Sequence, residues 1–460
     1  MRSGRDEEHL SHSSRRDATA ARRTTDREIL RLAVPAFLAL VAEPLFLLAD
    51  AAFVGHLGTP QLAGLGIAGA VLQTAVGLCV FLAYGTTASV ARHVGAGDLR
   101  GALVQGIDGV WLGVVIGAVT TVAGIAATPW LVAAFGASGE VADHATTYLR
   151  IAFLGTTPLL VMLATTGVLR GLQDTRTPLV AAVVGNLLNI ALNGMLVYGV
   201  GPLPALGLRG SATGSVLAQT LAAAFLVVVV TRGARAHGAP LRPDLPGIAA
   251  AAHAAVALVV RTLTLRAALL VSTYAATHTG GDADLATHQL AMTLWTFLAF
   301  ALDAIAIAAQ AITGRFLGAG DVTGTRRTTR RMIQWGLASG VVTGLALAAL
   351  SPVLGRLFTS DHAVQQLLAP VLLVAALGQP IAGVVFVLDG VLIGAGDGTY
   401  LAWAGLTVLV VYTPMALAAP TLTWLWVAFS FGFMSARAAF LLHRAHGDAW
   451  LVTGTRLPRH

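Results

Sequence analysis

The sequence predicts an all-α membrane protein in which twelve transmembrane helices form two lobes of six helices each. Three observations support this prediction. Long apolar stretches recur along the whole chain, charged residues are rare, and the two halves of the chain share short motifs at a constant spacing. The first two observations indicate a lipid environment, and the third indicates a duplicated architecture.

Composition separates this chain from soluble proteins. Of its 460 residues, 56% are hydrophobic and 11% are charged, whereas a soluble globular domain carries about 25% charged residues. A helix needs roughly 20 apolar residues to cross the hydrocarbon core. The stretches that meet this requirement are separated by clusters of Arg, Gly, Pro and Asp, and they cover 29–56, 62–90, 102–127, 146–169, 178–199, 208–231, 248–277, 285–312, 332–351, 366–393, 400–418 and 422–443.

The distribution of arginine predicts the orientation of these helices. All 29 basic residues are Arg, and with a cytoplasmic N-terminus only Arg150, Arg209 and Arg356 fall in outside loops or at their edges. Cytoplasmic loops carry the excess of basic residues, so both termini are predicted to lie in the cytoplasm and the protein in the inner membrane. The predicted inside segments hold Arg92, Arg100, Arg170, Arg176, Arg232, Arg235, Arg242, Arg315, Arg326, Arg327, Arg330, Arg331 and four Arg after residue 436.

The formal charge of +7 does not indicate a nucleic-acid partner, because eight of the arginines lie within residues 1–31. That N-terminal segment is cationic enough to contact anionic lipid head groups. Membrane lipids and a small-molecule substrate are therefore the expected partners.

A repeat divides the chain into two halves. The sequence GAGD at 95–98 recurs at 318–321, an offset of 223, and the same offset aligns GVLRGLQDT (167–175) with GVLIGAGDGT (390–399). Six spans per half is an even number, so both halves enter the membrane in the same direction. They are then related by a pseudo-two-fold axis along the membrane normal, and parallel repeats of this kind enclose a central cavity.

The predicted organisation has five parts. They are a disordered Arg-rich cytoplasmic tail (1–26), an N-lobe (27–231), a cytoplasmic linker (232–247), a C-lobe (248–445) and a cytoplasmic C-terminal tail (446–460). The Gly-rich GAGD and GLQDTRTP segments are predicted to be tight turns that cap helices, with Asp and Arg exchanging hydrogen bonds.

Acidic residues inside the first span are candidates for function. A charged side chain near the bilayer centre costs about 2.5–3.5 kcal/mol on insertion scales, so it is expected to face a cavity or a partner. Asp50 lies deep in this span, one heptad after Glu43 and on nearly the same face. Pro44 interrupts the helix between them and leaves backbone groups free. The alternative for Asp50 is a buried structural carboxylate. The alternative for Glu43 is an ion pair with Arg266, the residue with which the repeat offset of 223 aligns it.

The second half carries two further acidic residues within spans. Asp303 is followed one heptad later by Gln310, so both side chains can face the cavity. Asp389 aligns with Thr166, so its carboxylate has no counterpart in the first half. A purely structural role remains the alternative for both aspartates.

Several motifs, taken in their order and spacing, resemble one transporter family. They are LADAAFVG around Asp50, ASVARHVGAGD (88–98), GVLRGLQDTRTP (167–178), NIALNGMLVYGVG (189–201), GLRGSATG (207–214) and FVLDGVLIGAGDG (386–398). The chain resembles the multidrug and toxic compound extrusion (MATE) family, and within it the DinF-like branch. The resemblance implies two lobes that form a V open to one side, and export driven by a proton or sodium gradient. It implies a monomer without a cofactor.

The resemblance also implies roles for individual residues. Asp50 matches an aspartate that takes up and releases the coupling ion, and a polar pocket would surround it, formed by Tyr148, Asn189, Asn193 and Ser211. Relatives often have aspartate at the position of Asn193, which cannot titrate here. Ordinary hydrogen bonding between helices is the alternative for both asparagines.

In the C-lobe, the position of Asp389 resembles an acidic residue implicated in coupling or cation recognition. A glutamate that some branches carry on the seventh helix is absent, since that segment holds Arg261 and Arg266. Its absence argues against sodium binding in this lobe. Acidic residues in the cavity, with the aromatic residues Trp295, Phe297 and Phe300, would suit a lipophilic organic cation.

The predicted function is a secondary active exporter that antiports a small, lipophilic cationic substrate against protons. Sodium coupling is one alternative. A second is a flippase for a lipid-linked substrate, which is expected to line its cavity with several arginines, whereas only Arg261 and Arg266 are candidates here. No catalytic constellation or metal-ligand spacing is present in the sequence, so neither an enzyme nor a metal site is predicted.

Overall fold

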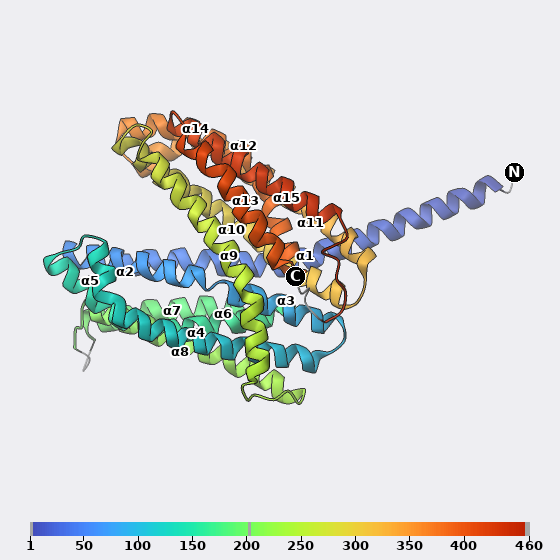
Figure 1. Ribbon diagram of the computed structural model, residues 1–460, viewed down its shortest axis with the longest axis horizontal. Helices are drawn as coiled ribbons and strands as arrows, with labels where there is room; N and C mark the ends of the chain where they lie inside the picture. The colour runs from blue at the N-terminus through green and yellow to red at the C-terminus, as the bar shows by residue number, and fades with distance from the viewer. Residues whose placement is uncertain (1–2, 201–203, 456–460) are drawn as a thin grey trace.

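The computed structural model describes residues 3–200 and 204–455, and within these residues the regular structure is entirely helical (Figure 1). Twelve segments are long and apolar enough to cross a membrane, which confirms the predicted fold class. The α-helices are α1 (Ser3–Gly55), α2 (Thr59–Leu78), α3 (Phe81–Gly95), α4 (Leu99–Ala134), α5 (Gly139–Ala152), α6 (Thr156–Gly171), α7 (Arg176–Tyr198), α8 (Leu208–Ala236), α9 (Leu245–Ala276), α10 (Asp282–Gly318), α11 (Val322–Phe358), α12 (His362–Gly394), α13 (Gly398–Leu417), α14 (Leu422–Val427) and α15 (Met434–His446).

Three of the twelve spans are built from two α-helices each. The second span joins α2 and α3, and the fourth joins α5 and α6 through a 3₁₀ turn at Phe153–Gly155. The twelfth joins α14 and α15 through a π-helical turn at Ala428–Phe433. The predicted spans all correspond to observed ones, with most of the observed helices extending a few residues beyond the apolar stretch.

From Ser3 onward, the segment predicted as a disordered tail is the first part of α1, which continues into the first span. The segment contains Ala, Arg and Glu, which favour helix, and no proline occurs before Pro35. Figure 1 shows this part of α1 projecting beyond the rest of the bundle. The first two residues lie outside the described range.

Aspartates cap several helices, as predicted for the Gly-rich turns. Asp98 accepts a hydrogen bond from the backbone N–H of Gly101 at the start of α4, and Asp321 accepts one from Gly324 at the start of α11. The bond from Gly101, assisted by neighbouring His93, holds the pKa of the Asp98 carboxyl below its ordinary value. The predicted exchange between Asp and Arg side chains is wrong at these two turns, because the carboxylates bind backbone amides instead. In the third GAGD segment (394–397) the prediction holds, because Asp397 accepts a hydrogen bond from Arg444 Nε at 2.6 Å.

The first membrane span of each half begins in contact with the opposite lobe. Near the start of the first span, Asp26 accepts hydrogen bonds from Arg331 at 2.6 and 2.7 Å and from the indole of Trp335 at 2.8 Å, both on α11. Farther along α1, the backbone carbonyl of Ala42 accepts a hydrogen bond from Asn186 on α7 in the N-lobe. Helix α1 therefore connects the two lobes.

Helix α9 makes the equivalent crossing in the other direction, and Figure 1 shows it running from one lobe to the other. Its N-terminal half contacts α3 and α4 of the N-lobe, while Ser272 in its C-terminal half hydrogen-bonds Tyr412 on α13. The linker is also shorter than predicted, because α8 continues to Ala236 and α9 begins at Leu245. Neither lobe is thus a continuous stretch of chain.

Close backbone contacts confirm the pseudo-two-fold relation between the lobes. A Cβ atom on Gly95 would collide with the carbonyl oxygen of Arg315, and one on Gly318 would collide with the carbonyl oxygen of Arg92. The repeat offset of 223 converts Gly95 into Gly318 and Arg92 into Arg315, so each contact is the counterpart of the other. A two-fold axis requires such reciprocal pairs. Glycine at both positions allows α3 and α10 to approach closely around the axis.

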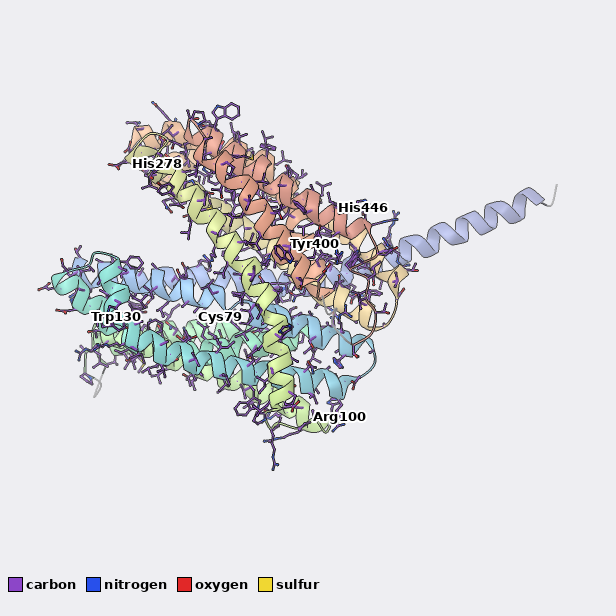
Figure 2. The ribbon with its side chains drawn as sticks, viewed as in Figure 1. Cys79, Arg100, Trp130, His278, Tyr400 and His446 are labelled. Carbon is purple, nitrogen blue, oxygen red and sulfur yellow. The ribbon has the colours of Figure 1, made fainter. Side chains whose placement is uncertain are left out.

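The lobes meet at the end of the bundle that holds Arg100 and His446, and they diverge toward the end that holds Trp130 and His278 (Figure 2). We call these the closed end and the open end. At the closed end the buried guanidinium of Arg92 donates hydrogen bonds to the carbonyl of Ala395 at 2.6 Å and of Gly454 at 2.9 Å. The N-lobe is therefore bonded both to the C-lobe and to the segment that follows α15.

Candidate functional site

Asp50 lies in a polar pocket formed by four N-lobe helices. Its side chain on α1 is 5% exposed and accepts three hydrogen bonds. The donors are Tyr148 Oη on α5 at 3.2 Å, Asn193 Nδ2 on α7 at 2.9 Å and Ser211 Oγ on α8 at 2.5 Å. The structure thus brings three of the four residues that the sequence predicted around this carboxylate into contact with it.

Asn189, the fourth predicted residue, is next to this pocket but does not bind Asp50. It lies one helical turn before Asn193 on α7 and donates a hydrogen bond to Ser215 Oγ at 3.0 Å. Ser215 was not identified from the sequence, although its spacing of four residues from Ser211 places both on one face of α8. Asn189 and Ser215 form a second layer beside the carboxylate pocket.

The pocket holds its carboxylate without a basic partner. Among the described residues, none of the ion pairs involves Asp50, and its three bonded neighbours are uncharged. A buried charge needs hydrogen bonds to compensate for lost hydration. Because the compensation here comes from neutral donors, the carboxylate can gain or lose a proton without breaking an ion pair.

Glu43 does not form the ion pair with Arg266 that was considered from the repeat. The Glu43 side chain is exposed, and Arg266 lies beside Gly77 of α2, where a Cβ atom would collide with its guanidinium. Neither residue lines the cavity of the C-lobe. Glu43 shares a helix with Asp50 but not its pocket.

A cavity of about 240 Å³ lies in the C-lobe, bordered by α9, α10, α12 and α15 and by Tyr84 from α3. Asp303, Gln310 and Asp389 all line it. The Gln310 amide donates a hydrogen bond to the backbone carbonyl of Tyr84 at 2.5 Å, which joins the two lobes at this point. In the described structure the Asp303 carboxylate has no hydrogen bond or ion pair.

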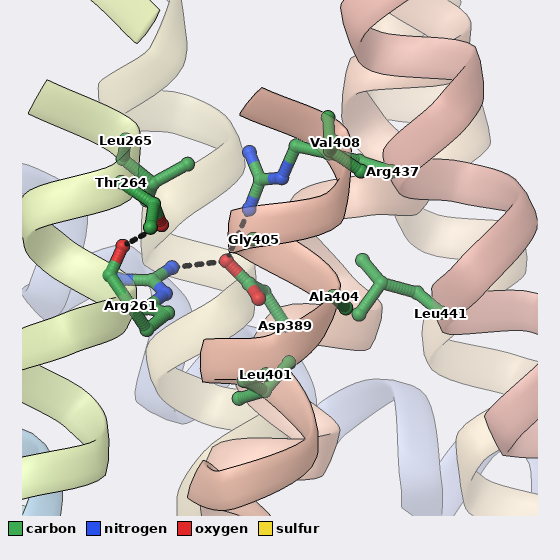
Figure 3. Close-up of a pocket in the computed structure, with 10 residues that line it drawn as sticks. All are labelled: Arg261, Thr264, Leu265, Asp389, Leu401, Ala404, Gly405, Val408, Arg437 and Leu441. Atoms are coloured by element: carbon green, nitrogen blue, oxygen red, sulfur yellow. Dashed lines mark hydrogen bonds and ion pairs between the residues drawn. The ribbon is translucent and has the colours of Figure 1, made fainter. Parts of the chain in front are cut away.

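Asp389, at the wall of this cavity, is shared by two arginines. Figure 3 shows these three side chains where they also line a second pocket, between α9, α12, α13 and α15. One of its oxygens, Oδ2, accepts hydrogen bonds from Arg261 on α9 and from Arg437 on α15, the latter at 2.7 Å. The three side chains are 8% to 13% exposed. Asp389 is therefore not a free acidic group, because two guanidinium groups already compensate its negative charge.

The placement of Arg437 corrects the prediction that counted it with the cytoplasmic arginines after residue 436. It lies inside the bundle, because Asp389 compensates its charge. An arginine within the apolar stretch FGFMSARAAFLL was the available sequence signal, since an intramembrane charge requires a partner. The sequence did not show which carboxylate is that partner.

The aromatic residues expected in the cavity are divided between three environments. Trp295 is buried in the C-lobe core, where its ring lies 6.2 Å from that of Phe386 and 5.2 Å from that of Phe429. Phe297 is half exposed, and of the three only Phe300 lines the cavity. Trp295 does not line it, because its side chain packs into the core behind the cavity wall, so its predicted contact with substrate stays a prediction.

Two six-helix lobes with buried carboxylates between their helices are the architecture of a membrane transporter. A model of the MatE family matches residues 35–195 and again residues 257–417, once in each half. The chain belongs to the MatE family, as the sequence motifs predicted.

Relatives with curated descriptions support this assignment. The chain is 30% identical to Protein DETOXIFICATION 44, chloroplastic, of Arabidopsis thaliana, over 89% of this chain and 80% of that protein. It is 28% identical to DNA damage-inducible protein F of Escherichia coli over 82% of each chain, which favours the predicted DinF-like branch. In fold it is similar to the Vibrio cholerae MATE transporter VcmN in the bent form, with a TM-score of 0.85 at 20% identity, over 93% of this chain and 98% of that one.

Proposed function

We propose that this protein is a secondary active exporter of the inner membrane that antiports a small organic molecule against protons. The observation that carries the proposal is the Asp50 pocket, where a buried carboxylate is held by three neutral donors. Proton binding there removes the negative charge that the donors stabilise. The hydrogen bonds between α1 and the helices α5, α7 and α8 then weaken, because bonds to a charged acceptor are the stronger ones.

Helix α1 links this event to the arrangement of the lobes. The start of its membrane span is bonded to the C-lobe through Asp26 and Arg331, and through an ion pair between Glu28 and Arg315 at 2.6 Å. Its later part carries Asp50 in the N-lobe, beyond Pro44, where the helix lacks one backbone hydrogen bond. A change at Asp50 can therefore alter the position of one lobe relative to the other.

Both termini are proposed to be cytoplasmic, which makes the open end face outward. This orientation is supported by the arginines near the closed end, among them Arg92, Arg100 and Arg315. Protonation of Asp50 from the outside would favour release of substrate there.

The predicted cationic substrate rested on acidic and aromatic residues of the C-lobe cavity. Asp389 is neutralised by two arginines, and Trp295 lies in the core. The same two arginines also argue against a sodium ion at Asp389. The charge of the substrate therefore depends on all the charged side chains around the cavity and not on Asp389 alone.

The test is gradient-driven efflux from liposomes that contain the purified protein. The liposomes are loaded with either the cationic dye ethidium or the anionic dye fluorescein, and an imposed pH gradient is applied without sodium. We expect wild type to release at least one dye in proportion to the gradient, and Asp50→Asn to release neither. The matched control is Asp448→Asn, the same chemical change on a side chain that is 86% exposed, which should behave as wild type.

Three results would contradict the proposal. Gradient-driven release by Asp50→Asn would make Asp50 a structural residue. Release that requires a sodium gradient would favour the sodium-coupled alternative. Movement of a labelled lipid-linked sugar, with no release of either dye, would favour the flippase.

A further inference from the structure

Four charged side chains line the C-lobe cavity, and a fifth interacts with one of them from the N-lobe. Asp303, Asp389, Arg261 and Arg437 line it, and Arg170 on α6 lies within electrostatic range of Asp303. Three guanidinium groups and two carboxylates leave one positive charge in excess.

We infer that this cavity binds an amphiphilic organic monoanion, with its carboxylate or other singly charged acidic group against Arg261 and Arg437. The inference rests on the proposed export function, and it names the substrate class of that function. A monovalent anion brings the group of charges to neutrality, whereas a monovalent cation raises the excess to two. Uncompensated charge is costly inside a membrane protein, so the cavity favours the anion.

The arginines have donors available for such a ligand. Arg261 and Arg437 converge on a single oxygen of Asp389, although each guanidinium has five N–H groups in a planar fork. In the described structure the buried Nε of Arg261 has no hydrogen-bond partner. A carboxylate can accept two parallel hydrogen bonds from one guanidinium, so a second acidic group can be accommodated beside Asp389.

The rest of the lining determines the other part of the ligand. Apolar side chains from three helices line the cavity, namely Leu265, Ala299, Phe300, Ile307 and Phe386. Tyr84 borders the same space, with the Arg261 guanidinium 5.8 Å from the centre of its ring. An apolar body joined to one anionic group matches both parts of the lining.

The experiment measures equilibrium binding by calorimetry to the full-length protein in phosphatidylcholine nanodiscs, without any gradient. Three probes share a naphthalene body and differ in charge: 2-naphthoate, 2-naphthylmethylammonium and neutral 2-naphthylmethanol. We expect 2-naphthoate to bind most tightly. Arg261→Gln should weaken its binding about tenfold or more, because a hydrogen bond to a charged group is lost. Asp303→Asn should tighten it, because the positive excess grows.

The matched control is Arg266→Gln, the same change five residues along α9 on a side chain that does not line the cavity. Its 2-naphthoate affinity should equal that of wild type. If Arg261→Gln weakened binding only by damaging the structure, Asp303→Asn would not be expected to tighten it. Opposite changes of 2-naphthoate affinity in the two variants therefore identify a charge effect. Arg261→Glu should reverse the preference toward the ammonium probe.

Tighter binding of the ammonium probe to wild type, or no binding of any probe, would overturn the inference. Equal weakening by Arg261→Gln and Arg266→Gln would overturn it as well. Competition by phosphatidylglycerol added to the discs would assign the site to a lipid head group, and no competition would assign it to a soluble anion; both support an anion site. Because binding needs neither a gradient nor Asp50, its failure is distinct from failure of proton-coupled efflux.

Discussion

Replacing Asp389 by asparagine should destabilise the protein by about 3–5 kcal/mol, the usual loss when one partner of a buried ion pair is removed. Among the described residues, Asp389 supplies the only carboxylate bonded to Arg261 and Arg437, whose side chains are 13% and 10% exposed. Two unit charges 4 Å apart attract by about 4 kcal/mol at an effective dielectric constant of 20. Two such attractions are lost and the repulsion between the arginines remains, while structural relaxation and water entry recover part of the loss.

The assay is unfolding by urea in dodecyl maltoside micelles, followed by tryptophan fluorescence, because both urea and this detergent are uncharged. The control is Asp448→Asn, which breaks the exposed ion pair with Arg326 and should cost less than about 1 kcal/mol. If Asp389→Asn costs no more than this control, the arginines are hydrated and the ion pair does not stabilise the bundle. We also expect 2-naphthoate to stabilise Asp389→Asn more than it stabilises wild type, because the ligand supplies the missing negative charge.

Two glycine substitutions test the Asp50 pocket and the closed end. Gly214→Ala should abolish proton-driven efflux without unfolding the protein, because the added methyl collides with Asn193 Oδ1 and displaces the side-chain amide, whose Nδ2 donates to Asp50. Wild-type efflux would contradict this geometry. Gly318→Ala should separate the lobes at the closed end, because its methyl collides with the carbonyl oxygen of Arg92. Spin-label distances between the α4–α5 and α9–α10 turns should then shorten, and unchanged distances would show that the contact does not hold the closed end. Gly69→Ala, with no atom within 4 Å of its added methyl, is the control for both.

Much of the candidate N-lobe site could be predicted from sequence, and much less of the C-lobe site. The residues that bind Asp50 come from motifs that keep their order and spacing along the chain, so the resemblance identified Tyr148, Asn193 and Ser211 by position. In the C-lobe the resemblance pointed to Asp389 but gave no partner for it. Its two arginines lie 128 and 48 residues away along the chain, and no local pattern relates them.

The sequence by itself determined the twelve spans, the duplication and the family. Spans follow from the roughly 20 apolar residues needed to cross the bilayer, and the duplication follows from one constant offset, so both are local properties of the chain. Only the tertiary structure decided that α1 and α9 connect the lobes, that Trp295 faces the core and that Arg437 neutralises Asp389. These outcomes depend on which helix faces meet, and that is set by side-chain packing and charge compensation between segments distant in sequence.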